Sequence, residues 1–527
     1  MRLQSQKTAE LPLIIASLAF LAFFIWEGNM IGADAKIPKA KRPATAERDL
    51  IIYEIPTKSA TSPNGPESGT FKSLEKRIPY LADLGINAVW LSGHSLADKN
   101  HFYNIWTQYA CVEPDKFDPS LGTPQEFDSM VDTFHRHGVK VFLDVITHGV
   151  MKGSPLIRKH PEWFKENGKK GSWGMIDYAE RKNAPREWEE WWVGLWVDMA
   201  LKHGVDGFRL DCNAKRPDLW REIKKKCAAH GVEIHIFNES HPSKGYTDAI
   251  TFGQGILVGS KFHPLENAEF KTVFSKVVKR TMEARDPRKG WKGFTRSVEL
   301  SCHDMGWEKY PLDKNPYVAQ GRRWLMGYAC LLLPAIPLMM AGEEFDCDFR
   351  PLPNLASSLF NAKNLGKGRW LYGSWIDWSQ IEKGKHSEML EDTKRLIAIR
   401  KKYAEIIHAE PWEKQPNMKT LDFKILDSEK NAPWIPKPYI QWNDEKAVLV
   451  AANPLDAKDI EIEVDAAPER FNPKWKNAEF LVTDIWNENA PPKKMTAEQL
   501  KHLKTRVKKD KTSRGGIAIL EIRPATP

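Results

Sequence analysis

Three acidic residues stand at or just after the ends of short apolar segments that are typical of β-strands. Asp211, Glu239 and Asp304 each follow such a segment. Side chains two residues apart share one face of a strand, so Arg209 should point the same way as Asp211. A guanidinium beside a carboxylate keeps the carboxylate ionised, as a nucleophile requires. Glu239 has no cation so near in sequence and follows apolar residues, which favours an acid that holds a proton.

A structural ion pair would explain Arg209 and Asp211 equally well if they stood alone. Three such acids, with His148 and His303 at the same level, are hard to explain as surface charge, because barrel enzymes place their chemistry at this end of the strands. Cleavage of a glycosidic bond needs one carboxylate to attack or stabilise the anomeric carbon and one carboxylic acid to protonate the leaving oxygen. This set of acids could supply both groups.

Short apolar runs alternate with amphipathic stretches over about residues 48–405. The runs cover residues 50–55, 87–91, 140–144, 205–211, 233–237, 249–252 (weak), 296–300 and 337–340. The helical patterns cover residues 74–84, 124–137, 186–203, 218–230, 267–285 and 318–333. Parallel strands need crossover connections, so this alternation predicts a parallel sheet covered by helices. With close to eight strands, the predicted fold is an α/β (β/α)8 TIM barrel.

The predicted barrel carries an insertion over residues 149–185, after its third strand, and a second domain follows it. The insertion extends from the carboxyl end of a barrel strand, so it should wall the substrate cleft. Residues 415–527 contain short strand-like runs with few helices, which predict a small antiparallel β-domain. One helix is expected there, after a capping-box pattern at Thr496, with the lysines of residues 501–511 on its solvated face.

The net charge of +9 is spread along the chain, apart from the lysines near residues 501–511. A solvated helix face explains that run better than a nucleic-acid site, so no nucleic-acid partner is expected. The six cysteines show no CxxC pair or zinc spacing and the histidines are scattered, so no metal site is predicted. Buried free thiols are the expected state of the cysteines. The 21 tryptophans suit either stacking on sugars or a large core.

Residues 1–35 have the pattern of a targeting segment. Arg2 and Lys7 precede a charge-free, largely apolar run over residues 11–26, and Ala33-Asp34-Ala35 matches a small-x-small cleavage pattern. The run is short for a bilayer span and slightly long for a signal peptide. Cleavage is favoured over a membrane tether through residues 11–26. Either outcome predicts a protein exported to the periplasm or the extracellular space.

Four short regions resemble those of the α-amylase family of glycoside hydrolases, in that family's order. They are Asp144-Val-Ile-Thr-His148, Gly207-Phe-Arg-Leu-Asp211, Glu239 after its strand, and His303-Asp304. Each motif is weak alone, but the ordered set is highly specific, and the resemblance covers about residues 48–405. It implies a retaining hydrolase that cleaves α-glucosidic bonds in starch-like α-glucans or oligosaccharides through a covalent glycosyl-enzyme.

The resemblance also implies a role for each candidate residue. By it, Asp211 is the nucleophile, Glu239 the acid/base and Asp304 the third carboxylate, which grips sugar hydroxyls as the ring distorts. The residues that would bind the sugar at the cleavage subsite are Tyr103, His148, Arg209 and His303. Packing in the core is the alternative role for the two histidines and for Tyr103.

The sequence departs from the family's pattern at three positions. Thr147 stands where many members have an Asn that binds calcium, and a hydroxyl is a poorer calcium ligand than an amide carbonyl. No structural calcium and no other cofactor is therefore expected. Asp144 lies one residue closer to His148 than is usual, which leaves their register open. Cys302 stands where an Asn usually precedes the His-Asp pair, which affects how Asp304 is held.

Two other functions fit the same residues. A transglycosylase or sugar isomerase would use the same acids and would differ only in whether water or a sugar intercepts the covalent intermediate. A non-catalytic carbohydrate-binding or scaffold protein would share the barrel, because a fold does not imply an activity. Loss of the acids would favour that last alternative, and all three acids are present.

Overall fold

The computed structural model describes most of the chain between residues 40 and 408 and most of the C-terminal region. The described ranges are 40–60, 69–98, 109–165, 174–212, 215–239, 249–250, 295–299, 322–347, 350–351, 374–408, 417–427, 435–455, 457–487 and 490–525. The targeting segment predicted over residues 1–35 and the helix predicted over 267–285 lie outside these ranges and stay predictions. Within the described ranges, no helix combines the length and the apolar character needed to cross a bilayer.

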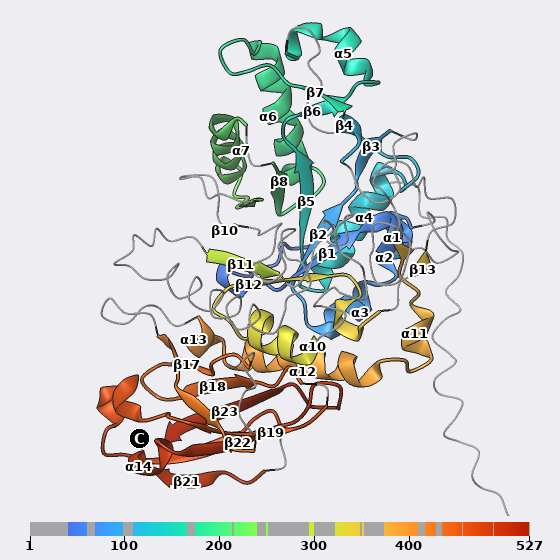
Figure 1. The fold of residues 1–527 in the computed structure, drawn as a ribbon. Coiled ribbons are helices and arrows are strands. Elements are labelled where there is room, and N and C mark those ends of the chain that lie inside the picture. Colours follow the sequence, from blue (N-terminus) through green and yellow to red (C-terminus); the bar gives the residue numbers. More distant parts are fainter. Residues whose placement is uncertain are drawn as a thin grey trace, which may run out of the picture. The chain divides into compact units, whose positions relative to one another are not determined.

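Eight parallel strands close into a barrel (Figure 1). Around the barrel they follow the order β1, β2, β5, β8, β9, β10, β11 and β12, and β12 pairs again with β1. Their bounds are β1 Ile52–Pro56, β2 Ala88–Ser92, β5 Lys140–Ile146, β8 Gly207–Asp211, β9 His235–Asn238, β10 Ala249–Ile250, β11 Thr295–Glu299 and β12 Ile336–Met340. Each strand overlaps a run predicted from the sequence, including the weak one, so the barrel prediction is confirmed.

The helices around the barrel are α1 Thr57–Ala60, α2 Phe71–Glu75, α3 Ile78–Leu84, α4 Pro124–Arg136, α6 Arg186–Leu201, α7 Pro217–Ala229, α10 Arg322–Trp324, π-helical η8 Leu325–Leu331, α11 Ser379–Glu382, α12 Ser387–Lys402 and α13 Ala404–Ile407. The helices α2, α3, α4, α6, α7, α10 and η8 overlap predicted amphipathic stretches, whereas α1, α11, α12 and α13 lie outside them. In α4, a capping box between Thr123 and Glu126 fixes the start. Phe127, Met130 and Phe134 recur at helical spacing and are buried, so α4 forms because one of its faces joins the core.

Alternation along the strands separates two apolar layers. The smaller cluster consists of Leu50, Ile52, Ala88, Trp90, Phe142, Phe237, Ile336 and Leu338, which fill the inside of the barrel. The intervening strand residues, such as Val89 and Val141, belong to the larger cluster shared with the helices. The strands are packed closely. A Cβ on Gly207, for example, would collide with the backbone carbonyl of His235 on the neighbouring strand, so this position requires glycine.

Most of the described tryptophans serve the core. The fully buried ones are Trp90, Trp188, Trp192, Trp196, Trp220, Trp324 and Trp486. Four of them come from α6 and α7, where Trp192 contacts Trp188, Trp196 and Trp220 at ring-centroid distances of 5.4–6.2 Å. For these residues, core packing is therefore the role that the structure supports.

The insertion after β5 is a short, ordered lobe. It contains β6 Gly149–Met151, α5 Pro155–Lys159, the 3-10 turn η3 Pro161–Trp163 and β7 Met175–Asp177, and β6 pairs antiparallel with β7. Two further short pairs join β3 Ser95–Ala97 to β4 Cys111–Phe117 and β13 Arg350–Pro351 to β14 Ser374–Trp375. Trp163 and Tyr178 are buried, and the ring of Tyr178 contacts Trp188 of α6 at 5.2 Å. The insertion is thereby anchored on the helix that follows it.

The C-terminal region forms two antiparallel sheets. One has the order β15, β17, β18, β23, β20 and β21, and the other has the order β16, β19 and β22. Their bounds are β15 Met418–Thr420, β16 Phe423–Ile425, β17 Tyr439–Trp442, β18 Ala447–Ala452, β19 Ile460–Val464, β20 Glu479–Asp484, β21 Lys493–Thr496, β22 Leu503–Val507 and β23 Ile517–Pro524. The larger sheet packs against the last barrel helices: the hydroxyl of Tyr328 donates to the carbonyl of Lys437 at 2.7 Å, and that of Tyr403 donates to Glu521 at 2.7 Å.

The expected helix after Thr496 was mostly wrong. The capping box forms, but α14 covers only Ala497–Leu500, and Leu503 begins strand β22. Leu503 and Val507 are buried, while Lys504 and Arg506 are exposed, because β22 pairs antiparallel with β19. The spacing of four residues that suggested one helical face also fits one face of a strand, and the pairing with β19 decides between them.

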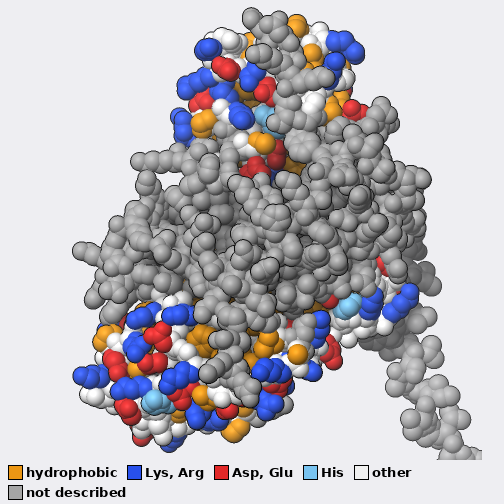
Figure 2. All heavy atoms as spheres, viewed as in Figure 1, with side chains coloured by type: hydrophobic (Ala, Val, Ile, Leu, Met, Phe, Trp, Pro, Cys, Tyr) orange, Lys and Arg blue, Asp and Glu red, His pale blue; other side chains and the backbone are white. Residues whose placement is uncertain are grey.

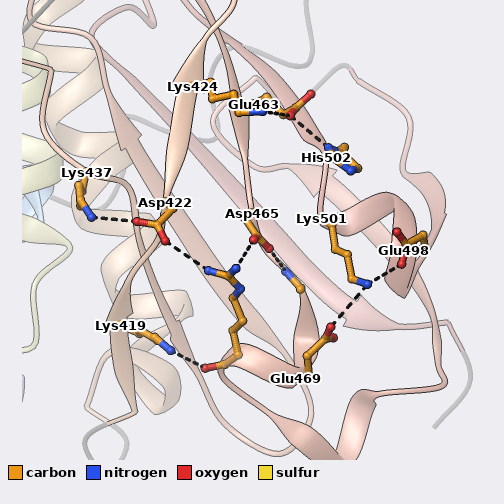
Figure 3. A network of polar contacts seen from close by, with 12 residues as sticks. Lys419, Asp422, Lys424, Lys437, Glu463, Asp465, Glu469, Glu498, Lys501 and His502 are labelled. Carbon is orange, nitrogen blue, oxygen red and sulfur yellow. Dashed lines mark hydrogen bonds and ion pairs between the residues drawn. The ribbon is translucent and has the colours of Figure 1, made fainter.

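The basic residues of this region alternate with acidic ones. Lys501 contacts Glu498 at 2.5 Å and Glu469 at 3.8 Å, and Lys437 contacts Asp422 at 2.9 Å (Figure 3). Figure 2 shows basic and acidic side chains interspersed over the same region. The described lysines therefore do not gather into a uniformly basic patch.

A buried carboxyl group after β12 makes folding stability depend on pH. Glu344 accepts hydrogen bonds from the hydroxyls of Tyr53 and Tyr80, each at 2.9 Å, and from the N–H of Gly342. Burial raises the pKa of Glu344 from 4.5 to about 7. The folded state thus holds this proton more tightly than the unfolded state, so the contribution is complete below pH 4.5 and is lost as pH rises through about 7.

The rise in the pKa of Glu344 corresponds to about 3 kcal/mol. Relative to Glu344→Gln, the free energy of unfolding of the wild type should therefore fall by up to about that amount between pH 4.5 and pH 8. Urea denaturation at several pH values measures the difference. Glu388→Gln, at an exposed position on α12, is the control and should track the wild type. Parallel profiles for the wild type and Glu344→Gln would contradict the prediction.

Candidate active site

The carboxyl ends of three neighbouring barrel strands bring the predicted acids together. β5 pairs with β8, and β8 pairs with β9, all in parallel. The side chains of Phe142 and Phe237 fill the barrel, so the residues two positions further along, Asp144 and Glu239, point to the same interior near its mouth. The same alternation applies along β8, so Asp211 at the end of this strand also points to the interior of the barrel. Strand period and parallel pairing together thus place these carboxyl groups at one end of the barrel.

Arg209 lies at the centre of this group and is buried. Its Nη1 donates to Asp211 at 2.8 Å and to Asp144 at 3.1 Å, and its Nη2 lies 3.5 Å from a carboxylate oxygen of Glu239. The guanidinium stands over the ring of Trp90 at 5.0 Å. Burial alone would lower the pKa of Arg209, but the surrounding acids outweigh burial and raise it well above its ordinary value. The guanidinium is therefore a fixed positive charge among three carboxyl groups.

The contact with Glu239 corrects one expectation from the sequence. Arg209 was expected to serve Asp211 and to leave Glu239 without a cation, but it touches both carboxyl groups. The parallel pairing of β8 with β9 causes this, because it sets Arg209 beside Phe237 and so brings Glu239, two residues further on, within reach of the guanidinium. The two acids differ in their other contacts: the backbone N–H of Cys212 donates to Oε2 of Glu239 at 2.6 Å and fixes its orientation.

Cys212 is the first residue beyond β8, and its backbone is unusual. Its φ of 51° lies in the left-handed region that residues other than glycine rarely adopt. Four of the five described cysteines are buried and free, as expected, but Cys212 is free and exposed. Although the residue as a whole is exposed, its sulfur is partly desolvated, and this desolvation together with the charges of Asp211 and Glu239 raises the pKa of its thiol. The expectation of a buried thiol was therefore wrong at this position.

His148 connects the acids to the insertion. The residue is buried, and its backbone carbonyl accepts a hydrogen bond from the N–H of Tyr178 at 2.8 Å. A cavity of about 260 Å³ lies beside it, and Tyr178 of the insertion and Trp188 of α6 are among the residues that line this cavity. The insertion therefore walls a cavity next to the acids, in the direction expected from the sequence.

The residues around Thr147 were tested against the calcium ion that the resemblance implies. The hydroxyl of Thr147 donates to the backbone carbonyl of Asp211 at 2.9 Å, so it is already engaged. The cationic residues that line the adjoining cavity are Lys165, Arg181, Lys215 and Arg216. Two acidic residues line the cavity as well, but Asp177 pairs with Lys165 at 3.1 Å and Glu180 with Lys182 at 3.9 Å. Calcium needs six to eight oxygen ligands, and the described residues at this place do not supply such a set.

The structure describes part of the predicted site. Asp211, Glu239, Arg209 and His148 lie in the described ranges and come together at the barrel mouth. The candidates outside those ranges are Tyr103, Cys302, His303 and Asp304.

Sequence reasoning missed Tyr109, whose hydroxyl donates to Asp144 at 2.5 Å and lies 3.3 Å from Arg209. It also missed the place of Trp90 beneath the guanidinium. For Trp90, the signal was available in its inward position on a predicted strand. Tyr109 follows no such pattern.

Loss of the central guanidinium should destabilise the fold. Arg209→Met would leave Asp144, which is fully buried, without its cation, so the free energy of unfolding should drop by about 3–5 kcal/mol. Arg186→Met is the matched control, because Arg186 forms an exposed ion pair with Glu190 on α6, and its loss should change stability by no more than about 0.5 kcal/mol. Urea denaturation followed by tryptophan fluorescence measures both. A drop in Arg209→Met as small as the control's would contradict the role assigned to Arg209.

Parts of the sequence are similar to one protein family and to several known enzymes. The family described as alpha amylase, catalytic domain, matches residues 54–194. A probable alpha-glucosidase from Rhizobium meliloti is 28% identical over 144 residues, which are 27% of this chain and 22% of the relative. A 4-alpha-glucanotransferase from Thermotoga maritima is 29% identical over 189 residues, 33% of this chain and 38% of the relative. The chain thus spans well under half of the length of these two relatives.

Solved structures share the fold over almost the whole chain. A maltogenic alpha-amylase from Thermotoga neapolitana superposes with a TM-score of 0.63 at 18% identity and covers 90% of this chain and 99% of its own. An alpha-amylase from Geobacillus thermoleovorans, complexed with acarbose, has a TM-score of 0.62 at 14% identity and covers 91% and 99%. At these identities the likeness shows the barrel and the C-terminal sheets and nothing about the reaction.

Proposed function

Because the chain belongs to the α-amylase family, we propose that it is a retaining enzyme that cleaves α-glucosidic bonds in starch-like α-glucans or oligosaccharides. The observation that carries the proposal is the shared guanidinium of Arg209, which holds Asp211 and Glu239 together at the mouth of the barrel. Retaining enzymes need two carboxyl groups close to each other, one to attack and one to protonate. The relatives named above include a probable alpha-glucosidase and a 4-alpha-glucanotransferase, names that are compatible with action on such bonds.

The two carboxyl groups have different tasks in this proposal. Asp211 attacks the anomeric carbon, and its hydrogen bond from Arg209 holds the carboxylate in place for that attack. Glu239 protonates the leaving oxygen, while the N–H of Cys212 holds its other oxygen. Glu239 then takes a proton from the water or sugar hydroxyl that opens the covalent intermediate, which returns the anomeric carbon to its starting configuration.

Product analysis tests this function. The purified chain is incubated with starch, pullulan, trehalose, sucrose and maltooligosaccharides, and products are separated by chromatography. Proton NMR of the first product should show the α-anomer, since a double displacement retains configuration. Shorter sugars alone indicate hydrolysis, whereas longer oligosaccharides indicate transfer to a sugar acceptor. A β-anomer, or no turnover of any of these substrates, would overturn the proposal.

We also propose that the fold holds without a structural calcium ion. Thr147 is engaged with Asp211, and cationic residues line the adjoining cavity, so a calcium ion would gain few oxygen ligands there. Activity and melting temperature should therefore stay within experimental error after treatment with EDTA. A large loss of either that added calcium restores would count against this.

A further inference from the structure

His148, Asp211 and Cys212 gather three different metal-ligating groups. One atom from each, a ring nitrogen, a carboxylate oxygen and a sulfur, lies within 4.8 Å of the other two. Tetrahedral zinc binds such atoms at about 2.0–2.3 Å, which sets them about 3.3–3.8 Å from one another. Rotations of exposed or partly exposed side chains such as those of Cys212 and Asp211 would close the remaining gap.

The backbone turn at Cys212 explains how the side chains of two consecutive residues, Asp211 and Cys212, can reach the same metal ion. Consecutive side chains of a strand point to opposite faces, so a regular strand would direct the thiol away from the carboxylate of Asp211. The left-handed φ of Cys212 ends β8 and breaks that alternation. Such a conformation persists only where the surroundings hold it. Here the hydrogen bond from the N–H of Cys212 to Glu239 helps to do so.

The imidazole of His148 provides independent evidence that this place binds another group. The residue is only 7% exposed, and neither ring nitrogen has a hydrogen-bond partner among the described residues. A buried polar group without a partner destabilises the fold, so a ligand that binds it is favoured. Imidazole is the commonest metal ligand in proteins.

The charges and the donor atoms of these side chains indicate which kind of ion the site would bind. The carboxyl groups of Asp144, Asp211 and Glu239 outnumber the guanidinium of Arg209 that they contact, whereas the cationic residues named above line the cavity beside His148, so the acidic side of the site accommodates a cation. A sulfur and an imidazole nitrogen select zinc over magnesium or calcium, which prefer oxygen.

We propose that His148, Asp211 and Cys212 bind Zn²⁺ and that bound zinc inhibits the enzyme. The thiol proton of Cys212 passes to solvent as the sulfur becomes a zinc ligand. Asp211 cannot ligate zinc and attack an anomeric carbon at the same time. The inhibition rests on the proposed function of Asp211, whereas the binding does not, and the two are tested separately.

Cobalt(II) reports binding without any substrate. Added to the full chain, it should give the near-ultraviolet charge-transfer band of a cobalt–thiolate bond and the visible bands of a four-coordinate ion, and zinc should displace it. Both Cys212→Ser and Cys212→Gly should lose the thiolate band. Glycine suits the left-handed backbone at this position, so the second variant guards against misfolding of the first. Absence of the band in the wild type, or its survival in both variants, overturns the proposal even if the chain turns over no glucan.

Inhibition is measured as the zinc concentration that halves each variant's own metal-free rate. That concentration should rise at least about tenfold in Cys212→Ser and Cys212→Gly, because even the loss of a residue that only hydrogen-bonds to a metal ligand lowers metal affinity about 10–100-fold. EDTA should restore the wild-type rate, and magnesium should not inhibit. His160→Ala is the control, because His160, Glu162 and Glu187 form the other described cluster of possible ligands. Equal zinc sensitivity of the wild type and the Cys212 variants, or relief by His160→Ala, would refute the inhibitory role.

Discussion

Asp211→Asn is expected to lower turnover of every α-glucan substrate by at least about 10⁴-fold, in line with the loss of other nucleophiles. The amide has nearly the shape of the carboxylate and can keep a contact with Arg209, but it carries no charge and does not attack the anomeric carbon. The fold should therefore stay intact while the chemistry stops. Steady-state kinetics on maltooligosaccharides, with a melting curve for each protein, separates the two effects.

Asp198→Asn is the matched control for this experiment. Asp198 lies on α6 in an exposed pair with Lys202, so the same chemical change should leave the rate within about twofold. A rate for Asp211→Asn within tenfold of the wild type would remove Asp211 from the mechanism. A loss of rate that comes with a collapsed melting temperature would instead assign Asp211 a structural role beside Arg209.

The barrel could be predicted because its signals are local. Parallel strands that are covered on both faces read as short apolar runs, and each is followed by a stretch that must cross back over the sheet. Thr123 and Glu126 mark the start of α4 by a capping box, and the burial of Phe127 confirms its apolar face. The acids at the strand ends followed from the same logic, since an acid in position 211 or 239 closes a predicted strand.

The rest depends on which segments become neighbours. The sequence places Arg209 two residues from Asp211, but only the pairing of β8 with β9 shows that it also reaches Glu239. Tyr109 reaches Asp144 from outside any predicted element. Leu503 and Val507 are four residues apart, a spacing that both a helix and a strand can bury, and pairing with β19 selects the strand. In each case tertiary contacts decide what local pattern leaves open.

Glu239→Gln should separate the two steps of the proposed reaction. Without an acid, cleavage of a glucan should slow by about 10²–10⁴-fold, because the leaving sugar must depart unprotonated. A glucosyl fluoride needs no such proton, so Asp211 should still attack it. The amide oxygen of the variant can accept the hydrogen bond from Cys212 N–H in place of the carboxylate, which keeps the geometry.

The same variant should then accumulate the covalent intermediate. Water needs a general base to open the glycosyl-enzyme, and glutamine cannot act as one, so the second step should become slower than the first. Mass spectrometry after a short incubation with the fluoride should find one glucosyl unit on the peptide that contains Asp211. Asp211→Asn, treated in the same way, should show none. An adduct on a different residue would move the nucleophile's role from Asp211 to that residue. Release of a β-anomer without any adduct would instead replace double displacement by a single displacement by water, with inversion.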